Sequence, residues 1–552
     1  MKKSMLRWIT KRILGRIPKI VLLTLVKAFH ALLTVLFALG SKGVINGAVS
    51  GDMSLFVDAC VKQAAIIAGI VLSLMFSRHL HDKLQADLEC DWKKQLLHGL
   101  LHGEYAAVQR FHSAELLNRL NNDVTRVNDG VLQLVPNVAA MITRLIAAIS
   151  VLGMLDLRFA LLLGAVGLVV IGITGLMRNR LKMLNKQVNE HDGRVSGFLQ
   201  EIMEKLLMVQ SMDVSHEVEQ RTEGLLEERY AVQRKRKNVS LFANTCVSIM
   251  MYSIGFLTLG WCSYRLLKGQ MNFGTLTAIT QLVSQVQAPF VNLSGIFPQY
   301  TALLASSERL MELEEIQGEP SPMTADVQAV YAQMKAIAAE GLSFSYDDDP
   351  IFHQTQFSLP KGSFAVITGP SGIGKSTLLK LLLGIIQPDS GRLLLAGEGE
   401  PLVLDRSTRR MFSYVPQGNL LLSGSLRDNL TIVRPQATAE EIEQAVYVSA
   451  MDEYLPQLPE GLDTRLGENG AGLSEGQAQR LAIARAVLGG APILLLDECT
   501  SALDEATEQK VLQRLKALPE RTCIAVTHRP AAIALCDWRL EVLDGKITAV
   551  KA

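Results

Sequence analysis

The sequence predicts a multidomain membrane protein in which a six-helix, all-α transmembrane domain precedes a soluble α/β domain. Hydrophobic residues make up 49% of the 552 residues and charged residues only 20%, which is apolar for a soluble chain. Apolar runs long enough to cross a bilayer lie in the first 308 residues. Beyond them short apolar strands alternate with amphipathic helical stretches, which is typical of a sheet covered by helices.

Six spans are expected, because about 18 apolar residues suffice to cross a bilayer. Three of the runs contain no Asp, Glu, Lys or Arg, and the other three contain isolated charges at Lys27, at Asp58 and Lys62, and at Arg144. The last charge-free run, 269–307, exceeds one span, so it should hold a loop and a helix that continues beyond the membrane. The expected spans are residues 19–41, 54–77, 133–155, 159–177, 241–264 and 274–300.

The first 20 residues are basic and contain no acid, with charges at Lys2, Lys3, Arg7, Lys11, Arg12, Arg16 and Lys19. Basic flanks stay on the cytoplasmic side of a membrane, so the N-terminus should lie inside. Six spans then place the charged connections 78–130 and 178–238, and everything after residue 308, in the cytoplasm. Both connections have helical periodicity, which predicts long cytoplasmic helical extensions that turn at their tips. A secretory signal is disfavoured, because five more spans follow.

Charge and cysteine content exclude several classes of protein. Lys and Arg total 55 and Asp and Glu total 54, so no global field attracts nucleic acid. The seven cysteines never form a C-x-x-C pair, which predicts reduced thiols rather than a zinc site or a disulfide framework. A Gly- and Pro-containing stretch near residue 320 indicates a linker, so the expected domains are a transmembrane domain 1–315, a linker 316–335 and a nucleotide-binding domain 336–552.

A phosphate-binding loop follows the apolar strand 364–368 and precedes a helical stretch. The pattern G-x-x-x-x-G-K-[ST] is matched by Gly369, Pro370, Ser371, Gly372, Ile373, Gly374, Lys375, Ser376 and Thr377. Glycines let backbone N–H groups turn toward a phosphate, Lys375 should reach the β- and γ-phosphates, and the Ser376 hydroxyl should bind Mg²⁺. A chance glycine-rich turn is the alternative, and the order of strand, loop and helix disfavours it.

A second motif is the buried strand 493–496, which ends in Asp497 and Glu498. Asp497 can hold Mg²⁺ through water, and Glu498 is placed to orient and deprotonate an attacking water. Between the two motifs lies Leu473-Ser474-Glu475-Gly476-Gln477. Ser474 and Gln477 form a capping box that starts a helix, and a helix N-terminus with a hydroxyl is also an anion site.

These motifs, in this order, resemble the ATP-binding cassette family, whose LSGGQ signature lies shortly before the acidic strand. The resemblance implies that Tyr346 stacks on adenine, that Gln417 senses Mg²⁺ and touches the membrane half, and that Asp504 belongs to the D-loop. His528 resembles the switch histidine on the γ-phosphate, and 467–470 resembles the exporter X-loop. The catalytic set is then Glu498, His528 and Gln417, the Mg²⁺ set is Ser376, Gln417 and Asp497, and the signature residues Ser474, Gly476 and Gln477 contact ATP.

In the membrane half, 113–124 and 305–309 are similar to segments of exporter-type (type IV) half-transporters. The family layout sandwiches ATP between the phosphate loop of one subunit and the signature of another, which implies a dimer. A complete set of catalytic residues favours a homodimer, and a heterodimer stays open. Glu475 departs from the pattern, since the family has glycine there, and it leaves open whether the two ATP sites are equal.

The resemblance implies an ATP-hydrolysing transporter in a bacterial plasma membrane that works by alternating access. Export of a lipid, a peptide or a drug-like molecule is favoured. An importer on the same fold, for example for iron chelates, and a regulatory or channel-like ATPase are the alternatives. Transported molecule and membrane lipids are the expected partners, and nucleic acid is not.

Ionisable residues at bilayer depth suggest a substrate pathway. Arg144 lies 12 residues before Asp156, or about 18 Å along a helix, near the middle of a roughly 30 Å core. An arginine there is costly and should face a wet cavity or an acidic partner. We hypothesise a pathway for an anionic group that is lined by His30, Arg144, Gln281, Gln285 and Asn292. A structural role for Arg144 is the alternative.

Overall fold

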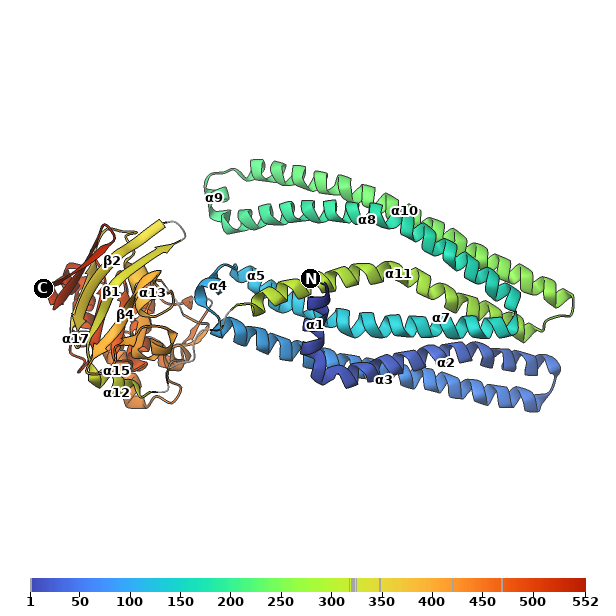
Figure 1. Ribbon diagram of the computed structural model, residues 1–552, viewed down its shortest axis with the longest axis horizontal. Helices are drawn as coiled ribbons and strands as arrows, with labels where there is room; N and C mark the ends of the chain where they lie inside the picture. The colour runs from blue at the N-terminus through green and yellow to red at the C-terminus, as the bar shows by residue number, and fades with distance from the viewer. Residues whose placement is uncertain are drawn as a thin grey trace. The chain divides into compact units, whose positions relative to one another are not determined.

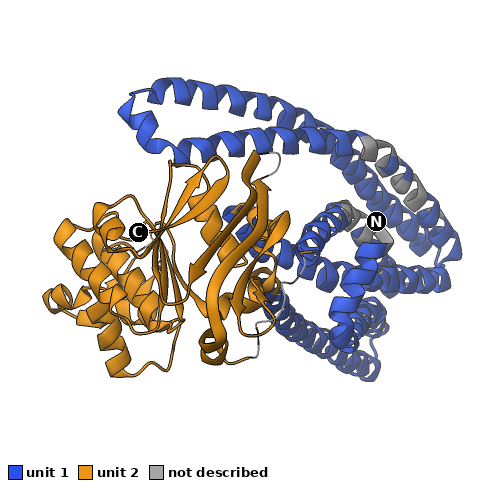
Figure 2. Cartoon of the chain, turned by 60° about the vertical axis from the view of Figure 1, so that its left-hand side comes forward, with its two compact units in different colours: residues 1–98, 113–315 blue, residues 99–112, 316–552 orange. Residues whose placement is uncertain are grey.

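The computed structural model describes residues 2–316, 318, 323, 325–346, 349–418, 421–467 and 470–552, apart from the side chains at 2–3, 162, 166–171, 173–174, 176–179, 289–295 and 297. The internal contacts of the chain divide it into two compact units (Figure 2). The first comprises residues 1–98 and 113–315, and the second comprises residues 99–112 and 316–552. The grouping of 99–112 with the second unit does not follow from the sequence.

Long helices make up the first unit. Their bounds are α1 Lys2–Ile13, α2 Ile17–Ser50, α3 Met53–His102, α5 Ser113–Asn118, α6 Val124–Asp129, α7 Val135–Leu155, α8 Leu157–Glu204, α9 Leu206–Ser211, α10 Ser215–Leu267 and α11 Phe273–Glu314. Turns of π-helix at Arg119–Asp123 and Gly130–Leu134 join α5, α6 and α7. The predicted fold class, a helical membrane region whose helices exceed the thickness of a bilayer, is confirmed.

Short turns join several of these helices. Gly51 ends α2 with a φ of 73°, a left-handed conformation that glycine adopts without strain. Asp156 caps α8 by accepting the N–H of Phe159 at 3.2 Å, and Asn272 caps α11 by accepting the N–H of Thr275 at 2.9 Å. These turns lie in the short intervals between expected spans, at 42–53, 156–158 and 265–273.

The α8–α10 pair confirms the predicted helical extension. Figure 1 shows the two helices side by side, joined through the short helix α9. The other extension is formed by α3, which continues to His102, and by the segment that begins again at Ser113. The helices α3, α8 and α10 run into these extensions without a break, and no proline interrupts them. The returning segment from Ser113 contains the two π-helical turns.

Among the described residues, four helical segments are long and apolar enough to cross a membrane: Ser4–Ser50, Met53–His102, Ser113–Leu155 and Ser215–Leu267. They contain the predicted spans one, two, three and five. Predicted spans four and six fall in α8 and α11, where part of the side chains lies outside the described residues. Large apolar side chains stay exposed on these helices, including Met154 (85%) and Phe256 (77%), as expected of surfaces that face lipid.

A buried carboxylate ties α11 to the π-helical turn after α5. Asp123 is fully buried and accepts hydrogen bonds from the Arg309 guanidinium at 2.6 and 2.7 Å and from the Ser306 hydroxyl at 2.8 Å. Arg119 pairs with Glu115 at 2.7 Å and donates to the carbonyl of Arg309 at 2.6 Å. The two membrane-half segments that resemble exporters, 113–124 and 305–309, are therefore bonded to each other.

The second unit has α/β architecture. Its helices are α4 Tyr105–Gln109, α12 Val327–Gln333, α13 Lys375–Leu382, α14 Leu426–Thr431, α15 Ala439–Val448, α16 Glu475–Leu488, α17 Glu505–Lys516 and α18 Pro530–Leu535. Its strands are β1 Met334–Tyr346, β2 Asp349–Pro360, β3 Phe364–Thr368, β4 Ser390–Gly397, β5 Leu402–Val403, β6 Phe412–Val415, β7 Gly424–Ser425, β8 Arg465–Leu466, β9 Ile493–Asp497, β10 Thr522–Val526, β11 Trp538–Leu543 and β12 Lys546–Lys551. The predicted α/β class is confirmed.

Two larger sheets form in the described part of this unit. One is antiparallel with the order β2-β1-β4-β5, and the other has the order β12-β11-β3-β10-β9-β6 and is parallel from β11 to β6. Alternate residues of β3 face two different apolar cores, Phe364 and Val366 one and Ala365 and Ile367 the other. A strand buried on both faces explains the uninterrupted apolar sequence of β3, β9 and β10.

Part of the predicted linker 316–335 is helical. Residues 327–333 form α12, and its buried Tyr331 lies with its hydroxyl 2.9 Å from the Thr522 hydroxyl on β10. The linker is predicted from Gly and Pro near residue 320, and these residues do not predict the helix α12 that follows them. A buried tyrosine with a hydrogen-bonded hydroxyl holds this helix against the sheet.

Candidate functional site

The phosphate-binding loop lies between β3 and α13, as the sequence predicts. Gly369, Gly372 and Gly374 have φ values of 152°, 79° and 103°. A Cβ at Gly374 would lie 2.3 Å from Cγ2 of Ile351, so a side chain is excluded there by space as well as by conformation. The loop therefore presents backbone N–H groups at the N-terminus of α13, which is a favourable place for a phosphate.

Lys375 is the cation of this loop. It is 7% exposed, and its Nζ donates to the carbonyls of Gly369 at 3.0 Å and Pro370 at 2.8 Å. Among the described residues it forms no ion pair. A buried ammonium held only by carbonyl oxygens is suited to an anionic ligand, because a charge taken from water needs a partner of opposite charge.

Asp497 ends β9 next to the loop. It is 2% exposed and accepts hydrogen bonds from the Ser376 hydroxyl on Oδ1 at 3.0 Å and from the Tyr414 hydroxyl on Oδ2 at 3.3 Å. Burial raises the pKa of this carboxyl group, and its hydrogen bonds oppose the shift. Burial and the nearby Asp497 charge raise the pKa of the Tyr414 phenol, which keeps it a donor.

Glu498 lies one residue past the strand, as expected, with a φ of 48° and its N–H bonded to the carbonyl of Val526 at 3.0 Å. A non-glycine residue in this conformation is uncommon and aims the side chain out of the strand direction. The Gln417 amide donates to Oε2 of Glu498 at 2.8 Å. Strands β3, β10, β9 and β6 are parallel neighbours, so their carboxyl ends bring these groups to one edge.

The signature residues form a second group. Ser474 caps α16, with the N–H of Gln477 donating to its hydroxyl at 3.3 Å and its own N–H donating to Oε1 of Gln477 at 2.9 Å. A Cβ on Gly476 would lie 3.0 Å from the carbonyl of Ala502, so the glycine permits a close approach to the D-loop. Glu475 is exposed. No hydrogen bond between described residues joins this group to residues 369–377.

The remaining predicted residues take separate positions. Tyr346 is 43% exposed at the end of β1, edge-on to Phe344 at 4.9 Å between ring centroids. Asp504 caps α17 by accepting the N–H of Thr507 at 3.0 Å, and His528 is exposed just after β10. Glu468 and Asn469 of the X-loop lie outside the described residues.

The residues present fit a magnesium nucleotide. The Ser376 hydroxyl and the Asp497 carboxylate are the oxygen donors that Mg²⁺ prefers, and two protein oxygens suffice when phosphates and waters complete its shell. Lys375 and the turned backbone suit the phosphates. Tyr414 is a part of this group that sequence analysis misses, because only the pairing of β6 with β9 brings it to Asp497.

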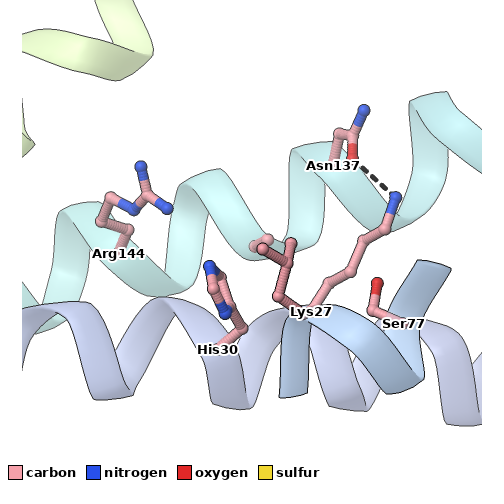
Figure 3. A pocket seen from close by; sticks show the side chains of 7 residues that line it. Lys27, His30, Ser77, Asn137 and Arg144 are labelled. Carbon is pink, nitrogen blue, oxygen red and sulfur yellow. Dashed lines mark hydrogen bonds between the residues drawn. The ribbon is translucent and has the colours of Figure 1, made fainter. Parts of the chain in front are cut away.

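A pocket of about 180 Å³ lies among α2, α3 and α7 in the first unit. Its polar lining consists of Lys27, His30, Ser77, Asn137 and Arg144 (Figure 3). The predicted pathway residues His30 and Arg144 are thus brought together.

The expected glutamines are not among the lining residues of this pocket. Gln285 instead donates to the carbonyl of Thr34 on α2 at 2.6 Å, so it joins two helices. The Asn292 side chain lies outside the described residues. The sequence misses Lys27 and Asn137 as pocket residues, because their pairing depends on how α2 packs on α7.

Known protein families match the two halves of the chain separately. Residues 352–501 match the family described as ABC transporter, and residues 20–290 match the family described as ABC transporter transmembrane region. The Mycobactin import ATP-binding/permease protein IrtB of Mycolicibacterium smegmatis is 32% identical over 385 residues, which are 68% of this chain and 66% of that protein. The Cyclolysin secretion/processing ATP-binding protein CyaB of Bordetella pertussis is 29% identical over 545 residues, 96% of this chain and 74% of that protein.

A solved structure, that of a bacterial Atm1-family ABC exporter with ATP bound, is similar in fold. The TM-score is 0.77 with 24% identity, and the match covers 98% of this chain and 94% of that one. The alignments with the two curated relatives leave a quarter to a third of those proteins unmatched.

Proposed function

Since the chain belongs to the ABC transporter family, as an exporter-type half-transporter with one membrane region and one ATPase domain, we propose that it drives export by hydrolysing ATP. One observation carries the proposal. Lys375, Ser376, Asp497, Glu498 and Gln417 converge at the carboxyl edge of one sheet, with hydrogen bonds of 3.0 Å from Ser376 to Asp497 and 2.8 Å from Gln417 to Glu498.

Each of these residues has a role that its geometry supports. Lys375 and the turned loop bind the β- and γ-phosphates, and Tyr346 offers an exposed ring to adenine. Ser376 and Asp497 would hold Mg²⁺, which neutralises phosphate charge when bound. Glu498 is the general base for the attacking water, and Gln417, within hydrogen-bond reach of Glu498, helps to hold that water.

The separation of the two site halves supports a dimer. Within the described chain no hydrogen bond joins Ser474 and its neighbours to residues 369–377, so one chain offers two half-sites rather than one closed site. In the proposed dimer the signature of each subunit, together with Asp504, closes on ATP held by the other. His528 follows β10 at the same sheet edge as Glu498, so it would contact the γ-phosphate of the ATP held by its own subunit. Because this chain has both half-sites, we propose a homodimer. Native mass spectrometry of the chain expressed alone tests it.

The membrane half would move an amphiphilic molecule, a lipid, a peptide or a drug-like compound, out of the cytoplasm of a bacterium. The N-terminal basic stretch supports a cytoplasmic N-terminus and ATPase domain. Closure of the ATPase domains would favour the outward-open state, and hydrolysis would reset it, since ATP must bind the two states with different affinity to shift their populations.

The direction of transport is tested directly. The relatives include a protein of cyclolysin secretion and one of mycobactin import. Import is therefore the second candidate. When ATP is added outside proteoliposomes, it reaches only the transporters whose ATPase domain lies on the outer side, so only these hydrolyse ATP and transport. Export predicts ATP-dependent movement of fluorescent phosphatidylglycerol into the inner leaflet, where dithionite does not quench it, and import predicts the reverse.

A further inference from the structure

The pocket among α2, α3 and α7 concentrates positive charge at the depth of the bilayer. Figure 3 shows Arg144 on α7 and His30 on α2 facing the same space, with Lys27 further along α2. Nζ of Lys27 donates to Oδ1 of Asn137 at 2.9 Å, and His30 lies 3.0 Å from the Ser73 hydroxyl through Nδ1. No lining residue in the described part of the chain is acidic.

The cations of this pocket have unused hydrogen-bonding capacity. Nε of Arg144 is buried and has no hydrogen-bond partner among the described residues. An ammonium has three N–H donors, and the bond to Asn137 uses one of those on Lys27. Asp129, on the neighbouring α6, accepts from Gln85 and Gln133, each at 3.4 Å, rather than from either cation. Two half-buried cations without a carboxylate partner among the described residues, within segments expected to span the membrane, are suited to an anion.

The size and position of the pocket indicate what carries the anion. The pocket extends from Asn137 to Arg144, about 10 Å along α7. Its Arg144 end is expected near the middle of the bilayer. Its volume of about 180 Å³ is enough for a small charged group such as a phosphate or a carboxylate. Beside the lining residues stand exposed apolar ones, Phe29, Phe76 and Ile142.

We propose that this pocket binds the anionic head group of an amphiphile, with oxygen atoms of a phosphate or carboxylate accepting hydrogen bonds from Arg144 and Lys27. The apolar tail lies along the exposed apolar residues of α2, α3 and α7. This inference rests on the proposed function, because it names the class of molecule that the transporter carries. Arginine binds two oxygens of such a group at once, which explains its use at a site that a neutral donor could fill.

The experiment measures binding without hydrolysis or transport, so its result is independent of the proposed direction. The full chain is placed in phosphatidylcholine nanodiscs without ATP and titrated with dodecyl phosphate, with dodecylphosphocholine and with inorganic phosphate. Binding is followed by calorimetry and by the shift of thermal unfolding. The first two probes share a tail and differ in head-group charge, and the third has the charge without a tail.

We expect dodecyl phosphate to bind the wild type at least about tenfold more tightly than either other probe, since charge-assisted hydrogen bonds are the strong ones. Arg144→Gln and, separately, Lys27→Gln should each lose about tenfold. Arg194→Gln, which removes the same group from an exposed position on α8, should bind as the wild type does. Arg144→Lys should lose less affinity than Arg144→Gln, because it keeps the charge and loses only the pair of parallel bonds.

Three outcomes would overturn the proposal: equal affinity for dodecylphosphocholine, equal affinity for inorganic phosphate, or wild-type affinity in both Arg144→Gln and Lys27→Gln. The second variant keeps the test decisive if the first does not fold. Lack of ATP-driven movement in proteoliposomes together with the expected binding would contradict the proposed function and leave the head-group site intact.

Discussion

Glu498 is placed by backbone conformation rather than by the strand itself. Its φ of 48° and the bond from its N–H to Val526 turn the carboxylate away from buried Asp497 and toward Gln417. Two adjacent acids therefore have different surroundings, and of the two only Glu498, which is partly exposed, is available to water.

Replacing Glu498 by Gln should leave ATP binding nearly unchanged and lower hydrolysis by about two to four orders of magnitude, the usual contribution of a general base. Phosphate release and binding of a fluorescent ATP analogue measure the two effects. Glu400→Gln, an equivalent change at an exposed turn, is the matched control and should hydrolyse normally. Hydrolysis above about a tenth of the parent rate would exclude Glu498 as the base.

Tyr414 positions the carboxylate of Asp497, which we propose binds Mg²⁺. Its hydroxyl is 3.3 Å from Oδ2 of Asp497, while Ser376 holds Oδ1, so the carboxylate is fixed from both sides. Tyr414→Phe should raise the Mg²⁺ concentration for half-maximal ATPase about three- to tenfold, the worth of one net hydrogen bond, with a smaller change in maximal rate. Magnesium titrations measure this, and Tyr447→Phe, a tyrosine 52% exposed on α15, is the control. If the Mg²⁺ concentration for half-maximal ATPase did not change in Tyr414→Phe, the hydroxyl of Tyr414 would have no role in Mg²⁺ binding and the side chain would contribute only by packing.

At the residue level, the sequence locates a motif whose residues are close together in the chain. The phosphate loop needs glycines at fixed spacing between a strand and a helix, so 369–377 and the acidic strand end are visible in the sequence. Tyr414 is invisible because β6 and β9 are neighbours only in the folded sheet, with Tyr414 paired in register with Leu495. Arg144 and His30 are suggested by depth alone, and Lys27 is missed because an isolated charge in an apolar span predicts nothing about its partner.

At the scale of elements, the buried pair of Asp123 and Arg309 connects the π-helical turn to α11. Arg309→Leu would leave Asp123 buried without its charged partner, which typically costs about 3–5 kcal/mol. We expect a lower temperature of thermal unfolding for the membrane half and poor recovery from detergent. Arg126→Leu, which removes a half-exposed cation 3.8 Å from the same Asp123, should have little effect.

The double change Asp123→Asn with Arg309→Gln separates charge from packing. It removes the buried charge with its partner, so it should recover much of the stability lost in Arg309→Leu. A double variant that unfolds as easily as the single one would mean that Arg309 contributes through the packing of its side chain against the π-helical turn rather than through its charge.

Element boundaries follow the sequence where periodicity is strong. The long helices α3, α8, α10 and α11 match the expected extensions because apolar spans continue into amphipathic stretches without a break. The helix α12 is not expected, since its seven residues lie within a predicted linker. The position of Gln285 differs from expectation because a polar residue in a span can bond a neighbouring helix carbonyl instead of facing a cavity.

At the scale of the whole molecule, the fold class and the family follow from the sequence, and the assembly does not. Order and spacing of motifs identify an ATPase domain after a membrane region. Nothing in one chain states which subunit supplies the signature to a given ATP. The grouping of Gly99–His112 with the second unit, through a bond from Arg406 to the carbonyl of His102 at 2.7 Å, is likewise a property of the folded chain.

The proposed assembly predicts complementation between two inactive variants. Lys375→Ala removes the phosphate-loop cation, and Ser474→Arg fills the signature with a bulky side chain, so each homodimer should fail to hydrolyse ATP. The activity of a mixed dimer of the two variants depends on whether ATP is shared between subunits or closed within one subunit. If ATP lies between subunits, the mixed dimer has one site built from the intact loop of the Ser474→Arg chain and the intact signature of the Lys375→Ala chain, and hydrolysis should return above both parents. If each subunit closed on its own ATP, both sites of the mixed dimer would carry a defect and no activity would return.

Co-expression with two affinity tags isolates the mixed dimer. The control is Ser474→Ala, which removes the helix cap at a cost of about 1 kcal/mol without adding a bulky side chain, so it shows how much of the loss in Ser474→Arg comes from the helix cap. Absence of complementation, with both chains folded and ATP binding retained by Ser474→Arg, would contradict the shared site.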